Sequence, residues 1–191
     1  VVTARTAGCQ RDAKGVGVFL GPANAKGVDI RGYETQDGSR AADIKFDNVE
    51  VGADAVIGDA ENGLSIVDQV VDDARIALCA EAVGAMEEAL KVSVEYIKER
   101  KQFGKPIAAF QHTQFMLADM KMKIDAARLM TYTAASNAER GEAAGGEKLG
   151  LLAAGSKTFA HDIALPVTTD AVHLLGGYCS TRDFPVERRM R

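Results

Sequence analysis

The sequence has few of the residues that mark special classes of protein: it contains no tryptophan, four prolines and three cysteines among 191 residues. Cys9, Cys79 and Cys179 lie far apart, form no CxxC pair and are odd in number. This pattern argues against a disulfide framework and favours a reducing, cytoplasmic compartment. No apolar run approaches the roughly 20 residues that a membrane span requires. We therefore expect a cytoplasmic protein without a membrane-spanning segment.

An excess of basic charge is also missing. The formal net charge is -4 and the pI is about 5.4, so we expect no nucleic-acid partner and no attraction to an anionic membrane. With 47% hydrophobic and 26% charged residues, the composition is typical of a soluble globular protein. The chain opens with VVTARTAG, which has neither an initiating Met nor a charged segment before an apolar one. This opening predicts a fragment that begins inside a strand and carries no signal peptide.

Residues 1–58 carry the patterns of β-strands. The run VGVFLG at 16–21 is short, apolar and closed by Gly21 and Pro22, and in DIKFDNVEV the side chains of Ile44 and Phe46 alternate with charged ones. Such alternation is typical of a half-buried strand. We predict that residues 1–58 are a fragment of an antiparallel β domain, the middle domain of a larger protein.

After Gly58 the hydrophobic residues recur every three or four positions, which predicts helices. The first stripe spans 64–100, the second runs from Thr113 to Ala134, and the third begins at Leu149. A fourth helix starts within TRDFPVERRMR, and the loop RGEAAGGEK separates the second helix from the third. Because the connections are short, neighbouring helices should be antiparallel. The prediction is an α+β fold, with residues 59–191 forming an up-down four-helix bundle whose last helix is truncated.

Several motif-like features are better interpreted as parts of helices. The segment GLLAAGSKT (150–158) imitates a phosphate-binding loop, but there the Lys must follow the second Gly directly, and here Ser156 intervenes. His112 and His161 have no partner at metal-ligand spacing, so we expect no metal site. Four methionines of the second helix are most simply core residues: Met116, Met120, Met122 and Met130.

Four segments resemble the C-terminal half of the acyl-CoA dehydrogenase family. RKQFGKPIAAFQ follows the long first helix, LADMKMKIDAARLM lies on the second, and DAVHLLGGYCSTRDFPVERRMR closes the chain. FDNVEVGADAVIGDAENGL is similar to the exit from that family's middle β domain. The resemblance covers essentially the whole chain and its motifs occur in the family's order. It implies FAD as the cofactor.

The resemblance assigns two groups of residues to the FAD of a neighbouring subunit. Arg100 would reach the pyrophosphate, and a helix end needs such a cation because its own dipole repels an anion. The alternative is that Arg100 only caps its own helix. His173, which stands where the family has Gln, would lie at the adenosine end, and Cys179 and Ser180 replace the family's Gly and aromatic residue there. The remaining implied FAD contacts are Gln102, Phe103, Ile107, Phe110, Gly176 and Gly177.

Two residues of the first helix match positions that contact the CoA part of the substrate in the family. These are Asp72 and Arg75 in VVDDARIAL. On the residues alone, a surface ion pair at helical spacing explains them as well. Both interpretations stay open from the sequence.

The family's reaction is α,β-dehydrogenation of an acyl-CoA thioester, in which a glutamate removes the α proton and the flavin accepts hydride. The implied partners are the acyl-CoA substrate, an electron-transfer flavoprotein, and further subunits in a homo-tetramer or hetero-oligomer. Two alternatives remain: a non-catalytic FAD-binding or structural subunit of a hetero-oligomer, and a flavin oxidase or monooxygenase on the same fold.

We expect no residue of this chain to be the catalytic base. In most of the family the glutamate follows the segment that matches PVERRMR, beyond Arg191. In some members it precedes the position of Arg75, where this chain has Ala74. Glu81 lies seven residues farther along, about 10 Å up the helix, which is too far for proton abstraction from the same place. The acyl length that the protein accepts cannot be predicted from this half.

Overall fold

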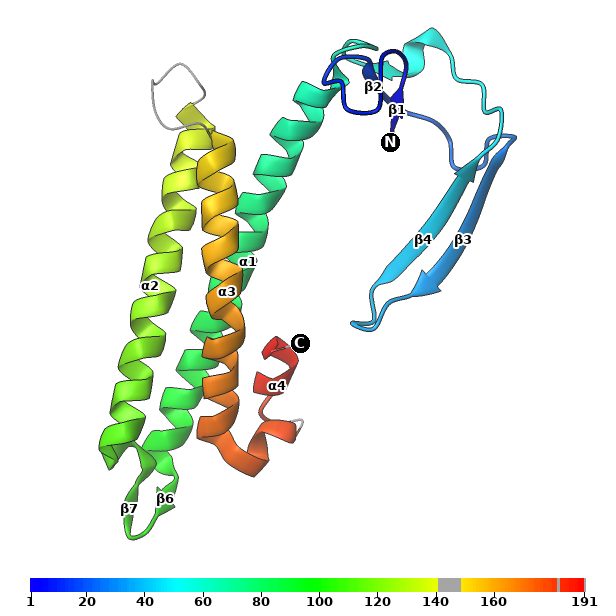
Figure 1. The fold of residues 1–191 in the computed structure, drawn as a ribbon. Coiled ribbons are helices and arrows are strands. Elements are labelled where there is room, and N and C mark those ends of the chain that lie inside the picture. The colour runs from blue at the N-terminus through cyan, green and yellow to red at the C-terminus, as the bar shows by residue number, and fades with distance from the viewer. Residues whose placement is uncertain (141–148, 182, 191) are drawn as a thin grey trace. The chain divides into compact units, whose positions relative to one another are not determined.

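The structure is a computed structural model that describes residues 1–140, 149–181 and 183–190 (Figure 1). The chain divides into two compact units, Val1–Val70 and Val71–Arg191. This division falls within the long helix α1 (Gly63–Glu99), which begins in the first unit and continues into the second. A domain boundary at residue 58 stays a prediction.

The first unit contains a small three-stranded sheet. Strands β1 (Val2–Arg5), β2 (Val16–Phe19) and β5 (Val56–Ile57) are antiparallel in the order β1-β2-β5. Val18 is buried at its centre. The first residue of α1, Gly63, packs against this strand so closely that a Cβ there would lie 2.9 Å from the Val16 carbonyl oxygen. A larger residue would therefore push α1 away from β2.

Strands β3 (Val28–Glu34) and β4 (Arg40–Phe46) form a separate antiparallel hairpin. Its register pairs Ile30 with Ile44 on one face and Arg31 with Asp43 on the other, so the alternation in the sequence becomes one apolar and one charged face. The antiparallel strands expected for this region are confirmed. A short 3₁₀ helix, η1 (Ala53–Ala55), links the hairpin to β5.

The hairpin turn is held by the Asp37 carboxylate. It accepts hydrogen bonds from the Thr35 hydroxyl, the Ser39 hydroxyl at 2.9 Å and the Ser39 backbone N–H at 3.1 Å. These bonds stabilise the charged form, the bond from Thr35 most, and lower the pKa of Asp37 to about 2. Gly38 follows with a φ of +82°, which other residues adopt at a cost.

The second unit is an up-down helical bundle. After α1 come β6 (Lys101–Gln102), β7 (Lys105–Pro106), η2 (Ile107–Ala109) and the helix α2 (Gln111–Arg140). Then follow α3 (Leu149–Leu175), η4 (Gly176–Ser180) and α4 (Val186–Met190). Figure 1 shows α2 returning alongside α1, and α3 packing along α2. The four-helix arrangement is confirmed, whereas the loop RGEAAGGEK lies mostly outside the described residues.

The core of the bundle consists of small and medium side chains from all four helices. Most of the predicted stripes are buried in it, including Cys79 and Ile97 of α1 and Met120 and Ile124 of α2. In α3 the buried residues continue beyond Pro166 to Leu175, so this helix is longer than its apolar stripe indicated.

Two of the four methionines expected in the core are exposed instead. Met122 is 65% exposed and Met130 is 36% exposed, whereas Met120 is fully buried. Met122 lies on the outer face of α2, because two positions from Met120 rotate a residue by more than half a turn. No helix of the described residues is long and apolar enough to cross a membrane.

Candidate functional site

The C-terminal end of α1 is followed by a tight hairpin that contains the predicted flavin-binding segment. Lys101 pairs with Pro106 and Gln102 with Lys105, which leaves Phe103 and Gly104 as a two-residue loop. Both loop residues have positive φ, 52° and 78°, as a type I′ turn requires. Gly104 suits this conformation, whereas a phenylalanine rarely adopts it. Sequence reasoning ended the first helical stripe at residue 100 but missed this hairpin.

Phe103 is 93% exposed at the tip of the hairpin. Its ring lies edge-on to that of Phe110, with centroids 6.5 Å apart, and the Lys105 ammonium lies 4.2 Å from the centre of the Phe110 ring. An exposed aromatic in a rare backbone conformation is unusual for a purely structural turn. The hairpin therefore presents Phe103 outward at the expense of turn stability.

The other half of the site is the junction between α3 and η4. α3 ends at Leu175, and Gly176, with a φ of +57°, turns the chain into η4. A Cβ added at Gly176 or Gly177 would find no atom within 4 Å. The backbone here is consequently open to a group that approaches from outside the chain.

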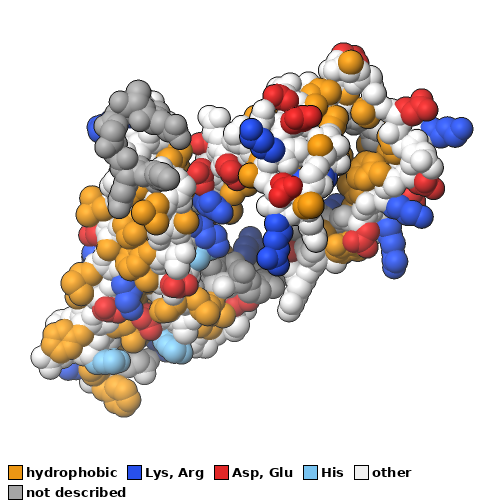
Figure 2. All heavy atoms as spheres, turned by 45° about the horizontal axis from the view of Figure 1, so that its top comes forward, with side chains coloured by type: hydrophobic (Ala, Val, Ile, Leu, Met, Phe, Trp, Pro, Cys, Tyr) orange, Lys and Arg blue, Asp and Glu red, His pale blue; other side chains and the backbone are white. Residues whose placement is uncertain are grey.

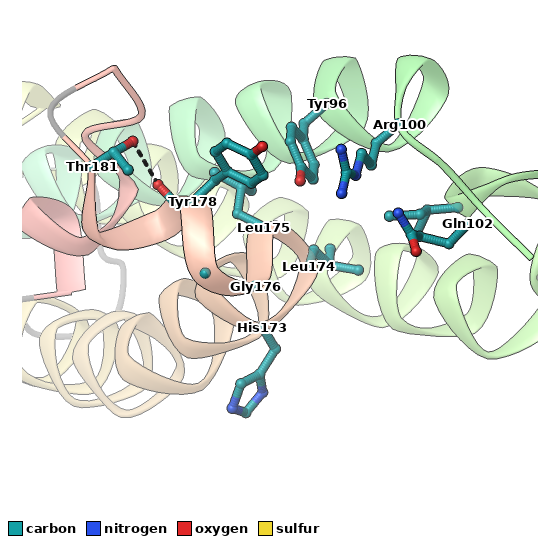
Figure 3. Close-up of a pocket in the computed structure, with 11 residues that line it drawn as sticks. Tyr96, Arg100, Gln102, His173, Leu174, Leu175, Gly176, Tyr178 and Thr181 are labelled. Carbon is teal, nitrogen blue, oxygen red and sulfur yellow. Dashed lines mark hydrogen bonds between the residues drawn. The ribbon is translucent and has the colours of Figure 1, made fainter.

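The two halves line an open cavity of about 450 Å³ between the ends of α1 and α3 (Figure 3). It brings together six of the eight predicted flavin-binding residues, whereas Phe103 and Phe110 do not line it. Figure 3 shows Tyr96 and Arg100 projecting from α1 toward Tyr178, while the His173 ring points away from them. The six predicted residues are Arg100, Gln102, Ile107, His173, Gly176 and Gly177.

Among the described residues that line this cavity, Arg100 carries a permanent charge and none is a carboxylate. Its guanidinium carbon lies 5.5 Å from the centre of the Tyr178 ring. Within the described part of the chain, the guanidinium makes no hydrogen bond or ion pair. It donates no hydrogen bond to the carbonyls of its own helix, although a cation at this position still interacts favourably with the helix dipole. Its five N–H donors are available to an anion.

The Arg100 backbone is fixed on both sides. Its N–H donates to the Tyr96 carbonyl at 2.9 Å, and its carbonyl accepts from the Ile107 N–H at 2.9 Å. The last turn of α1 and the start of η2 thus hold the Cα in place, and only the side chain can move. The cavity supplies a positioned cation, open glycine backbone and apolar walls, which fit the phosphate and nucleoside parts of FAD.

Sequence reasoning missed five residues of the cavity: Tyr96, Leu174, Leu175, Tyr178 and Thr181. Tyr96 precedes Arg100 by one helical turn, so the helical period could have identified it. Tyr178 follows Gly177 directly, but its contact with Arg100 joins segments more than 70 residues apart. No local pattern reports such a contact.

The predicted substrate residues form an ion pair on α1. The Arg75 guanidinium donates to the Asp72 carboxylate at 2.7 Å. The Asp72 side chain is 14% exposed and that of Arg75 is 41% exposed. A Cβ at Gly150 of α3 would lie 3.2 Å from the Asp72 carboxylate, so this glycine makes room for it. Asp72 is enclosed and anchors Arg75, which faces solvent.

Comparison with known proteins gives a consistent result. The family profile described as acyl-CoA dehydrogenase, C-terminal domain, matches residues 61–191. A probable acyl-CoA dehydrogenase of Mycobacterium tuberculosis is 44% identical over 184 residues, which cover 95% of this chain and 46% of that protein.

Solved structures agree with these sequence matches. The butyryl-CoA dehydrogenase from Megasphaera elsdenii is 35% identical with a TM-score of 0.85, over 98% of this chain and 48% of that one. A chain in the structure of the electron transferring flavoprotein of Acidaminococcus fermentans is 39% identical with a TM-score of 0.80, over 92% of this chain and 46% of that one. The chain spans about half the length of the relatives it matches.

Proposed function

The chain belongs to the acyl-CoA dehydrogenase family, and we propose that the whole protein catalyses FAD-dependent α,β-dehydrogenation of an acyl-CoA thioester. The observation that carries the proposal is the cavity at the end of α1, where Arg100, whose guanidinium has no hydrogen bond or ion pair among the described residues, lines the same space as the open backbone of Gly176 and Gly177. Relatives named as acyl-CoA dehydrogenases at 37–44% identity support the reaction class.

The residues of this chain bind and orient the cofactor and the substrate. Arg100 binds the FAD pyrophosphate of a neighbouring subunit, and Gly176 and Gly177 let its adenosine end approach the backbone. Phe103, which is exposed in this chain, covers part of that cofactor. FAD supplies the hydride acceptor that no amino-acid side chain can provide.

Arg75 is proposed to bind the CoA part of the substrate, with Asp72 holding its guanidinium. The catalytic base is proposed to lie outside these residues, since position 74 is an alanine. Electrons would pass to an electron-transfer flavoprotein, and the similarity to a chain in the Acidaminococcus fermentans structure supports this acceptor.

The experiment replaces Arg100 with Gln in the full-length protein. A charge-assisted bidentate contact to phosphate contributes about 2 to 3 kcal/mol, whereas a cation at a helix end contributes nearer 0.5 kcal/mol. Arg100→Gln should therefore lose most of its flavin on gel filtration, with a small change in melting temperature. Absorbance at the flavin band and a thermal melt measure the two effects.

The same preparations test the reaction. Wild-type protein should reduce an artificial electron acceptor in the presence of at least one member of an acyl-CoA panel, and Arg100→Gln should recover activity only at raised FAD concentration. Flavin content that is unchanged in Arg100→Gln would return Arg100 to a helix-capping role. A flavin-loaded wild type that is inactive with every acyl-CoA would instead favour the non-catalytic subunit.

A further inference from the structure

Tyr178 contacts Arg100 from the opposite wall of the cavity. It belongs to η4, whereas Arg100 directly follows α1, and the guanidinium carbon lies 5.5 Å from the ring centroid. A cation within about 6 Å of an aromatic face is attracted by the ring quadrupole. Among the described residues, the Arg100 guanidinium has no carboxylate partner and no carbonyl acceptor. The Tyr178 ring is the group that interacts with it.

The Tyr178 ring is itself held by two other aromatic rings. Its centroid lies 6.1 Å from that of Tyr96 and 6.2 Å from that of Phe184, and those two rings are 5.5 Å apart. The tilted contact with Tyr96 and the edge-on contact with Phe184 restrict the orientation of the Tyr178 ring. Tyr178 is nevertheless 46% exposed, so one part of the ring is packed and the other borders the cavity.

An unrestrained arginine would be a poor receptor for an anion. Ordering its side chain on binding costs rotamer entropy, which weakens the binding. A ring that attracts the guanidinium restrains it beforehand without accepting a hydrogen bond from it, and so leaves its N–H donors free for an anion. A carboxylate partner would occupy those donors, as Asp72 does for Arg75.

We propose that Tyr178 is a positioning residue: it orients the Arg100 guanidinium over the cavity for a diphosphate. The proposal rests on the proposed flavin-binding function and adds the residue that prepares Arg100 for it. Tyr178 directly follows Gly176 and Gly177. The same short segment therefore supplies both the open glycine backbone and the ring that orients the Arg100 guanidinium.

The test is a double-mutant cycle on the full-length protein freed of flavin, with the Kd for FAD measured by calorimetry. Tyr178→Leu should raise the Kd about 3- to 10-fold in the wild-type background, the range of one cation–π contact. In the Arg100→Gln background, Tyr178→Leu should have no further effect, because the group that it orients is gone. Tyr178→Phe should keep the wild-type Kd, since it keeps the ring.

Two further variants separate positioning from folding. Pentafluorophenylalanine at Tyr178 preserves the ring's shape but removes the negative face that attracts a cation, and should raise the Kd as Tyr178→Leu does. Tyr33→Leu, at a tyrosine of β3 with nearly the same exposure of 48%, should leave the Kd unchanged.

The outcomes distinguish the positioning role of Tyr178 from the flavin site itself. If Arg100→Gln weakens FAD binding but Tyr178→Leu has the same effect in both backgrounds, or no effect in either, the positioning role is overturned and the flavin site stands. A fluorinated ring that binds FAD as the wild type does also overturns it. If Arg100→Gln leaves the Kd unchanged, the flavin site itself is wrong.

Discussion

At the scale of single residues, the Asp72–Arg75 pair is compatible with two roles that differ in energy. A pair whose arginine is 41% exposed contributes about 0 to 1 kcal/mol to folding. A guanidinium that binds a phosphate contributes about 1.5 to 3 kcal/mol to ligand binding. Replacing Arg75 should consequently affect substrate binding more than stability if the CoA assignment holds.

We predict that Arg75→Gln raises the KM for acyl-CoA about 10- to 100-fold, with flavin content unchanged. Steady-state kinetics and a thermal melt measure the two effects. Lys91→Gln is the matched control, because Lys91 forms an ion pair with Glu88 at the same spacing on the same helix, at 3.8 Å. Equal KM values for the two variants would leave Asp72–Arg75 as a surface ion pair.

At the scale of elements, the hairpin between α1 and α2 holds Phe103 in a backbone conformation that lowers the stability of the turn but keeps the ring exposed. A type I′ turn favours Asn-Gly, but this loop has Phe103 before Gly104, and Phe103 has a φ of 52°. Its ring is almost wholly exposed, so burial in this chain does not compensate for the conformation. Contact with a group outside the chain would compensate for it.

We predict that Phe103→Asn raises the free energy of unfolding by about 0.5 to 1 kcal/mol, since Asn tolerates positive φ, and weakens FAD binding. Urea unfolding and calorimetry measure the two. Gly104→Ala is the control for the turn alone, and should lower stability because its φ of 78° suits glycine. A stabilised Phe103→Asn variant with unchanged FAD affinity would contradict a flavin contact for Phe103.

At the scale of the whole molecule, the second unit exposes an apolar stripe along α2. Phe115, Met122 and Leu129 are 64%, 65% and 68% exposed and recur every seventh residue, so they lie on one face of the helix. Figure 2 shows hydrophobic side chains gathered on the surface of the helical unit. A stripe of this kind favours association with another helix.

We therefore predict that the full-length protein is an oligomer, and that Met122→Glu weakens its association. Charge on the stripe would have to be desolvated in an interface, whereas Ala135→Glu, at an exposed position of the same helix away from the stripe, should leave assembly intact. Light scattering on a size-exclusion column measures the mass. A stable wild-type monomer would contradict this prediction.

The sequence by itself determined the elements, because their signals are local. The alternation around Ile44 and Phe46 predicted a strand, and the stripe that contains Cys79 and Ile97 predicted α1 to within a residue or two of its ends. Each depends on a side chain's place within one turn or one pleat. The same period places Met122 more than half a turn from the buried Met120, so its exposure followed from the period, and the core interpretation was wrong because it relied on residue type.

The tertiary structure decided which residues form the site. Arg100 and Gly176 are singled out by family motifs, but their meeting in one cavity with Tyr178 depends on how far α1 and α3 extend before they turn. α3 extends farther than its stripe indicated, and the positive φ of Gly176 then directs η4 back toward α1. Contacts between residues more than 70 positions apart arise from the packing of whole helices, and packing is a property of the folded chain rather than of any local segment.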